Sequence, residues 1–213
     1  MKTSTEIFET LYKTYPALIP CRDSIERAYT SLLSCARENA TVLVCGNGGS
    51  AADSEHIVGE LMKGFNLRRP LNDAEKSKFS GIPDGKDIAD KLQSGIRAIS
   101  LVSQTGLITA FSNDVDPELI FAQQVFAYAQ KKDDVLIALS TSGNSKNVVK
   151  AVYAAKAAGI CSIAITGDKE SKLSESADIT VMLPAHTPFE VQELTLPVYH
   201  ALCAAVEAEM FTA

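Results

Sequence analysis

Short apolar runs alternate with amphipathic stretches from residue 41 to the end of the chain. The runs are rich in β-branched residues and apolar on both faces, which is typical of strands covered on two sides, and they lie at 41–45, 98–102, 135–139, 162–166 and 179–183. Apolar positions at helical spacing predict helices near 51–64, 117–130, 145–158 and 188–211. This alternation predicts an α/β fold, a three-layer sandwich with a five-stranded parallel sheet.

Two regions differ from this alternation. Residues 1–39 have apolar positions at helical spacing, interrupted by Pro16 and Pro20, and predict N-terminal helices. Residues 71–95 are polar, lysine-rich and poor in apolar periodicity. A connection this long within a compact domain is usually a functional lid or a disordered excursion. We therefore expect a single domain over 1–213, with a polar insertion at 71–95 as a candidate lid.

Composition narrows the class of protein. The chain has 213 residues, of which 46% are hydrophobic and 22% charged, as in ordinary soluble globular proteins. No apolar run reaches the roughly 18 residues of a membrane span, and the acidic N-terminal stretch does not resemble a signal peptide. These features favour a cytoplasmic protein without membrane contact. The net charge of −6, without a basic stripe, argues against broad nucleic-acid binding. Five scattered cysteines without a C-x-x-C pair indicate buried structural thiols.

Two loops rich in glycine and serine follow the first and third predicted strands. GNGGS at 46–50 lets the backbone turn sharply and approach a ligand, and the helix after it offers unpaired N–H groups. STSGNS at 140–145 gathers hydroxyls and amides without lysine or arginine, which suits a phosphate monoester. Either loop alone could be a tight turn or a helix cap. Neither matches a dinucleotide fingerprint or a Walker loop. Together, at the carboxyl ends of parallel strands, they predict a ligand site.

Three histidines can be judged one by one. His56 and Glu60 lie four residues apart, on one face of the helix after GNGGS. They are either part of a functional site or a solvent-exposed i,i+4 pair. His200 lies among apolar residues of the last predicted helix, where a core histidine is the default. Gln192 by itself would be a surface amide. His186 receives no role.

The runs CGNGGSAADSEHIVGEL, STSGNSKNVVKA and VQELTLPVYHALC resemble the phosphosugar-binding SIS domain, and within it the phosphoheptose isomerase family. The resemblance covers about residues 40–210 apart from the insertion. It implies an isomerase that interconverts a ketose phosphate and an aldose phosphate, sedoheptulose 7-phosphate and D-glycero-D-manno-heptose 7-phosphate, through an enediol. It also implies a homotetramer with sites at subunit interfaces and one zinc ion per site. The alternative is a non-catalytic phosphosugar-binding regulator or an adaptor for a replication initiator protein, since some relatives serve as such.

The resemblance also implies roles for individual residues. The implied substrate-binding residues are Asn47, Gly48, Gly49, Ser50, Glu60, Asn113, Asp114, Ser140, Thr141, Ser142, Ser145 and Gln192. The implied zinc ligands are His56, Glu60, Gln192 and His200, of which Glu60 and His200 are also the acid–base pair. Proton transfer through an enediol needs such a base and donor, and two imidazoles, a carboxylate and an amide form a plausible zinc shell. No nicotinamide, flavin or ATP is expected.

The sequence departs from the family at three places. Met62-Lys63-Gly64-Phe65 replaces the usual T-G-R-Y run, Glu190 stands where an arginine is common, and the insertion at 71–95 is longer than the usual connection. We expect the insertion to fold over the substrate and one of its lysines to supply the lost positive charge. The alternative is a solvated excursion without contact to the site.

The spacing of Gln192 and His200 bears on the assembly. Along a regular helix they are about 12 Å apart, with a rotation of about 80° between them. One metal ion does not easily bind both from one straight helix. Pro197 could bend the helix, but the simpler expectation is that a neighbouring subunit supplies one of the two ligands.

Overall fold

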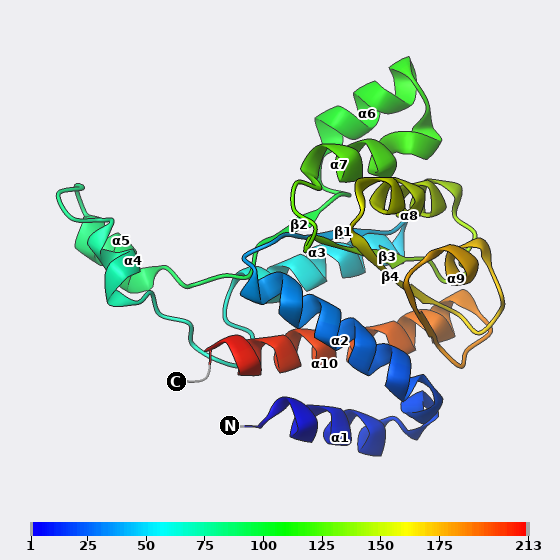
Figure 1. Cartoon of the computed structure of the whole chain (residues 1–213), viewed down its shortest axis with the longest axis horizontal. Coiled ribbons are helices and arrows are strands. Elements are labelled where there is room, and N and C mark those ends of the chain that lie inside the picture. Colours follow the sequence, from blue (N-terminus) through cyan, green and yellow to red (C-terminus); the bar gives the residue numbers. More distant parts are fainter. Residues whose placement is uncertain (1, 212–213) are drawn as a thin grey trace.

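Five parallel strands form one sheet in the order β2-β1-β3-β4-β5 in the computed structural model, which describes residues 2–211 (Figure 1). The strands are β1 Val42–Cys45, β2 Ala98–Ser100, β3 Val135–Leu139, β4 Cys161–Thr166 and β5 Ile179–Met182. Each predicted strand is confirmed, with ends within two residues of the predicted ones. From β1 the chain continues to β2 on one side and returns to β3 on the other, and ligands bind at such a switch point in open α/β sheets.

Helices cover both faces of the sheet and complete the predicted three-layer sandwich (Figure 1). Val42 and Val44 of β1 face the core formed with the first set of helices, α1 Ser4–Thr14, α2 Arg22–Arg37, α3 Gly49–Met62 and α10 Pro188–Phe211. Leu43 and Cys45 face the core formed with the second set, α7 Ile120–Tyr128, α8 Lys146–Ala158 and α9 Lys172–Ser176. This alternation is the two-residue period of a strand buried on both sides.

The N-terminal and connecting segments are also largely helical. The predicted N-terminal helices are confirmed as α1, the short 3₁₀ helix η1 Pro16–Cys21, and α2. Between β2 and α7 lie α6 Thr105–Asp114 and a 3₁₀ turn, η2 Pro117–Leu119. The sequence analysis did not anticipate α6, none of whose residues is buried. Ile108 and Phe111 pack against the second core but are only half-buried, so the helix leaves a weak apolar stripe in the sequence.

The insertion forms two short helices, α4 Asp73–Ser77 and α5 Gly85–Lys91, that project away from the sheet on the left of Figure 1. We call residues 71–92 the arm. An isolated antiparallel bridge between Pro70 and Gln93 closes its root. Three of its four lysines form ion pairs with aspartates of the arm itself: Lys76 and Lys86 with Asp90, and Lys91 with Asp87. Whether the arm covers a substrate stays a prediction.

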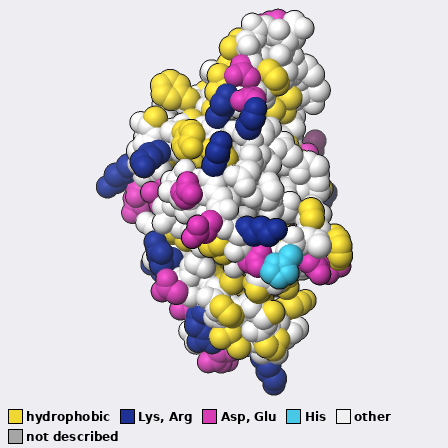
Figure 2. Space-filling view, turned by 90° about the vertical axis from the view of Figure 1, so that its right-hand side faces the viewer, with side chains coloured by type: hydrophobic (Ala, Val, Ile, Leu, Met, Phe, Trp, Pro, Cys, Tyr) yellow, Lys and Arg dark blue, Asp and Glu magenta, His cyan; other side chains and the backbone are white. Residues whose placement is uncertain are grey.

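The burial of the cysteines and the mixed charge of the surface agree with what the sequence predicts. All five cysteines are free, and all except the half-buried Cys161 are buried, as predicted. Burial raises the pKa of the Cys35, Cys45 and Cys203 thiols to about 12. On the face shown in Figure 2, basic and acidic side chains are interspersed. No helix within residues 2–211 combines the length and the apolar character needed to span a membrane.

Candidate active site

The two predicted loops meet at the switch point of the sheet. GNGGS connects β1 to α3, and STSGNS connects the neighbouring strand β3 to α8. A reciprocal pair of amides joins them: Asn47 Nδ2 donates to Asn147 Oδ1 at 2.8 Å, and Asn147 Nδ2 donates to Asn47 Oδ1 at 3.0 Å. The sequence analysis missed Asn147, which only the pairing of the two strands brings to Asn47.

The GNGGS loop depends on glycine at two positions. Gly48 has φ = 57°, in the left-handed region that favours glycine. Gly49 begins α3 and lies against the side chain of Gln192 from α10, so that a Cβ at this position would overlap the Gln192 amide. The structure thus brings Gln192 to the GNGGS loop, with Ser50 buried one residue further on.

The STSGNS loop presents hydroxyls at the start of α8. Ser140 Oγ donates to Ser145 Oγ at 3.0 Å, and Ser142 Oγ accepts from the Asn144 N–H at 3.2 Å, which leaves the Ser142 proton available. Thr141 belongs to the same turn, where its carbonyl accepts from the Gly167 N–H. A helix start with free donors of this kind suits a phosphate group.

Two lysines of α8, the helix after this loop, are already paired. Lys146 Nζ lies 2.8 Å from Glu118 Oε1, and Lys150 bonds to Glu118 and Asp116. Hydrogen bonds from the two lysines lower the pKa of Glu118 to about 2. An anion at the STSGNS loop would therefore be bound chiefly by hydroxyls and backbone N–H groups, as the sequence predicts.

Two polar atoms beside this loop are buried and have no hydrogen-bond partner within residues 2–211: Thr166 Oγ1 at the end of β4 and Asp168 Oδ1 two residues later. The other carboxylate oxygen of Asp168 lies 2.7 Å from His186 Nδ1. Orphaned polar atoms of this kind fit a site that receives a polar ligand. The sequence analysis missed Asp168 and gave His186 no role, although a Gly-Asp pair directly after a predicted strand was an available signal.

A second cluster joins α3 to α10. His56 Nε2 lies 3.2 Å from Glu60 Oε1 and 3.4 Å from His200 Nε2. His200 is half-buried, and burial followed by the neighbouring His56 lowers its pKa. The structure therefore brings the predicted acid–base pair, Glu60 and His200, to the same imidazole. The second oxygen of Glu60 lies 3.3 Å from the exposed Lys63 Nζ, so the cation beside Glu60 lies outside the arm.

Tyr199 contacts the Nδ1 side of the His56 ring, and Asp53 contacts Tyr199 in turn. The sequence analysis did not identify either residue as part of the site. The buried Tyr199 hydroxyl lies 2.9 Å from His56 Nδ1 and 3.3 Å from Asp53 Oδ1. Burial and the Asp53 charge raise the pKa of Tyr199, which keeps it a phenol. If this phenol donates to Asp53, its oxygen accepts from His56 Nδ1–H and leaves a lone pair on Nε2 facing Glu60 and His200.

The donors of this cluster match zinc in type and partly in spacing. Separations of 3.2 and 3.4 Å are close to the edge of a tetrahedron with zinc–ligand bonds of about 2.0–2.1 Å. However, no group of three or more His, Cys, Asp or Glu side chains in residues 2–211 is arranged to hold a metal ion. Gln192, on the same continuous helix as His200, lies at Gly49 and makes no hydrogen bond to the cluster within the described chain. One chain therefore supplies the donors without a complete shell.

The remaining predicted pair, Asn113 and Asp114, lies at the exposed end of α6. Asn113 Nδ2 donates to Asp114 Oδ1 at 2.8 Å. No hydrogen bond within residues 2–211 joins this pair to either loop or to the histidine cluster. Their predicted contact with substrate stays a prediction.

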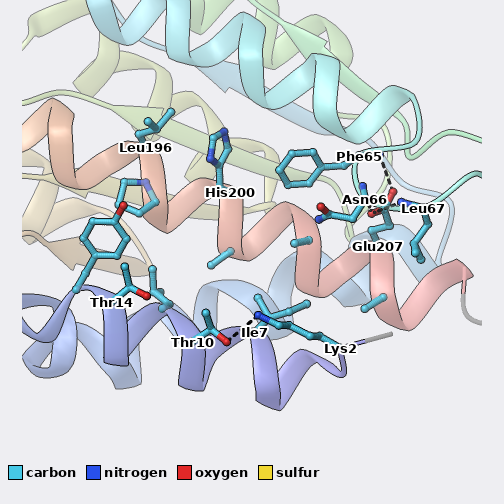
Figure 3. A pocket seen from close by; sticks show the side chains of 16 residues that line it. Lys2, Ile7, Thr10, Thr14, Phe65, Asn66, Leu67, Leu196, His200 and Glu207 are labelled. Atoms are coloured by element: carbon cyan, nitrogen blue, oxygen red, sulfur yellow. Dashed lines mark hydrogen bonds between the residues drawn. The ribbon is translucent and has the colours of Figure 1, made fainter.

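A groove of about 730 Å³ runs between α1 and α10 (Figure 3). Its lining is largely apolar and includes Ile7, Leu196 and Phe65, with His200 among the polar exceptions. The two glycine–serine loops do not contribute to it. The groove is thus poorly suited to a sugar phosphate, but it reaches one of the catalytic candidates.

Comparison with known proteins finds matching families, related sequences and similar structures. The SIS domain family matches residues 98–206, and a second SIS domain family matches residues 17–84. The chain is 35% identical over 187 residues to a phosphoheptose isomerase from Laribacter hongkongensis, covering 86% of this chain and 83% of the relative. Two solved structures are similar: phosphoheptose isomerase GmhA from Neisseria gonorrhoeae (TM-score 0.71, 27% identity, 96% and 93% coverage) and a phosphoheptose isomerase from Francisella tularensis (TM-score 0.72, 26% identity, 96% and 98% coverage).

Proposed function

The chain belongs to the SIS-domain phosphoheptose isomerase family, and on that premise we propose that it interconverts sedoheptulose 7-phosphate and D-glycero-D-manno-heptose 7-phosphate. One observation carries the proposal: Glu60 from α3 and His200 from α10 both reach His56, on the helix that begins at the GNGGS loop. A base and a proton donor thus meet on the helix that begins at the GNGGS loop.

The geometry suggests how the residues divide the work. The STSGNS loop and the start of α8 bind the phosphate, while Asn47 and Gln192 orient the sugar. Glu60 takes a proton from one of the two reacting carbons and returns it to the other. His200, kept neutral by its lowered pKa, moves a proton between the two oxygens.

We further propose one zinc ion per site. His56, Glu60 and His200 would hold it, with Gln192 as the fourth ligand. When bound, zinc would polarise the oxygens of the sugar as a Lewis acid. Two donor separations of tetrahedral size support this proposal. Zinc content after purification, compared between wild type and His56→Ala, tests it directly.

We also propose a homotetramer with sites at subunit interfaces. Gln192 and His200 point to different parts of α3 within one chain, so a second subunit can complete the ligand set. The apolar groove beside His200 and helix α6, which has no fully buried residue, offer surfaces for neighbouring subunits. Light scattering of the purified protein should give four times the chain mass of 22.8 kDa.

We place the enzyme in the cytoplasm. All five cysteines have free thiols, as is usual in a reducing compartment. Fractionation of the source cells, with the protein detected by antibody, tests this assignment.

The main experiment is incubation of the purified protein with sedoheptulose 7-phosphate, with and without added zinc. Wild type should form the aldose phosphate, and Glu60→Gln should lower turnover by on the order of 10²–10⁴ because the base is lost. Glu55→Gln is the matched control, since Glu55 lies on the same helix and bonds to Ser103. Tight binding of the sugar phosphate without any turnover by wild type would instead favour a non-catalytic regulator or a replication-initiator adaptor.

A further inference from the structure

An ion pair is buried where the connection after α3 crosses α10. Arg69 and Glu207 are each 1% exposed, and Arg69 Nε lies 2.8 Å from Glu207 Oε1. Glu207 lies in α10 two turns after His200, and Arg69 lies seven residues after the end of α3. Removing two charges from water costs several kcal/mol per ion, so a buried pair persists only when further hydrogen bonds satisfy it.

Those further hydrogen bonds all go to backbone groups near the site. The Glu207 carboxylate accepts from three successive N–H groups, those of Phe65, Asn66 and Leu67, at 2.7, 2.7 and 3.2 Å (Figure 3). One carboxylate on α10 therefore binds a whole turn of the connection that leaves α3.

The arginine binds the other side of the same junction. Arg69 Nη1 donates to the Leu61 carbonyl at 2.7 Å, and Nη2 donates to the Glu60 carbonyl at 3.2 Å. Helix α3 ends at Met62, so both carbonyls belong to its last turn, where helical partners are missing. The guanidinium also stacks on the Phe211 ring, 4.5 Å from its centroid. Arg69 thus ties the backbone of Glu60 to α10.

We infer that Arg69 and Glu207 are positioning residues that fix the last turn of α3, and with it the Glu60 carboxylate, against the helix that carries His200. This inference rests on the proposed function, in which Glu60 and His200 act together. The pair does not touch the substrate. It sets the distance between two side chains that come from different helices, and productive geometry needs a tolerance of about 0.5 Å.

The hydrogen bonds of the pair explain why neither lysine at position 69 nor a pair of apolar side chains could replace it in this role. An ammonium group has no planar fork, so lysine at position 69 would not bind Glu207 and two carbonyls at once. Two apolar side chains could fill the same volume and preserve stability. They would remove the Arg69 hydrogen bonds from the last turn of α3 and leave the Leu61 carbonyl with the Ile96 N–H as its partner. This difference separates a positioning role from a purely structural one.

The test compares Arg69→Lys, Glu207→Gln and the apolar double variant Arg69→Met/Glu207→Leu with wild type, well below each melting temperature. The matched control is Arg68→Lys, since Arg68 is the exposed neighbour. We expect kcat to fall about tenfold or more, because misplacement by about 1 Å can cost 10² in rate. KM should stay within about twofold, since the STSGNS loop, which is proposed to bind the phosphate, follows β3 and does not contact the Arg69–Glu207 pair. Arg68→Lys should behave as wild type.

A readout independent of turnover is available because the chain has only three histidines. The imidazole NMR signals of His56 and His200 should shift in Arg69→Lys and not in Arg68→Lys, while that of the distant His186 stays fixed. If a single variant does not fold, the double variant decides. Unchanged kcat with unchanged His56 and His200 signals in a folded variant overturns the inference. Absence of turnover in wild type contradicts the proposed function. In that case the His56 and His200 signals by themselves test the positioning role.

Discussion

The Gln192 side chain of α10 lies directly against Gly49, the first residue of α3, so that a methyl group there would overlap its amide. Helix α10 therefore reaches the GNGGS loop through a contact that only glycine permits. Gln192 and the GNGGS loop are thereby fixed to each other.

Replacing Gly49 by alanine should push the Gln192 amide away from the loop and lower kcat/KM by about tenfold or more. Gly59→Ala is the matched control on the same helix, because nothing lies within 4 Å of its added methyl. That control should keep wild-type kinetics and gain roughly 0.5–1 kcal/mol of stability from its better helix propensity. Steady-state rates and thermal melts measure both. Wild-type kinetics in Gly49→Ala would show that Gln192 is not needed at the loop.

The STSGNS loop should recognise the phosphate. Ser142→Ala should weaken binding of a sugar phosphate by about 1–3 kcal/mol, because a phosphate oxygen loses a donor. Binding of the unphosphorylated sugar should hardly change. Titration calorimetry compares the two ligands, with Ser77→Ala on the arm as the control. If both ligands lose affinity equally, the loop reads another part of the molecule.

A site shared between subunits should show complementation. Gln192→Ala and His200→Ala chains should each be inactive. Mixed oligomers should regain activity at sites that take Gln192 from one kind of chain and His200 from the other. Subunit exchange is confirmed by mass spectrometry of differently tagged chains before rates are compared. Persistent inactivity of confirmed hybrids would place both residues in one subunit's site.

The arm should be removable without loss of the fold. Only Gly85 and Ala89 are buried within α5, and α4 has no buried residue, so a short glycine–serine connection in place of residues 72–92 should leave the melting temperature nearly unchanged. If the arm closes over a substrate, KM should rise. Lys86→Ala, which breaks an ion pair inside the arm, is the milder control. Identical kinetics after the deletion would identify the arm as a solvated excursion.

The fold was predictable where burial is two-sided. The runs that became β1 and β3 are apolar on both faces, so their composition alone marks them as central strands. The helices α4, α5 and α6 escaped prediction because they bury few side chains: α4 and α6 have no fully buried residue, and α5 has two.

The site was predictable only where it is local in sequence. The four-residue spacing of His56 and Glu60 places them on one helix face, but the arrival of His200 depends on how α10 packs on α3. Arg69 lies in a polar stretch whose pattern predicts an exposed segment, and Glu207 lies near the end of the last predicted helix. Their pairing over 138 residues of sequence separation follows from tertiary packing alone.

The burial of the cysteines has a practical consequence for labelling. Raised thiol pKa values and the apolar surroundings of Cys35, Cys45 and Cys203 keep these sulfurs protonated and shielded from alkylating reagents at neutral pH. A single cysteine introduced on the exposed arm, for example Ser77→Cys, would then be the preferred target for a fluorophore or a spin label. The half-buried Cys161 would be replaced first, and the position of the arm could then be followed by spectroscopy with the buried native thiols left in place.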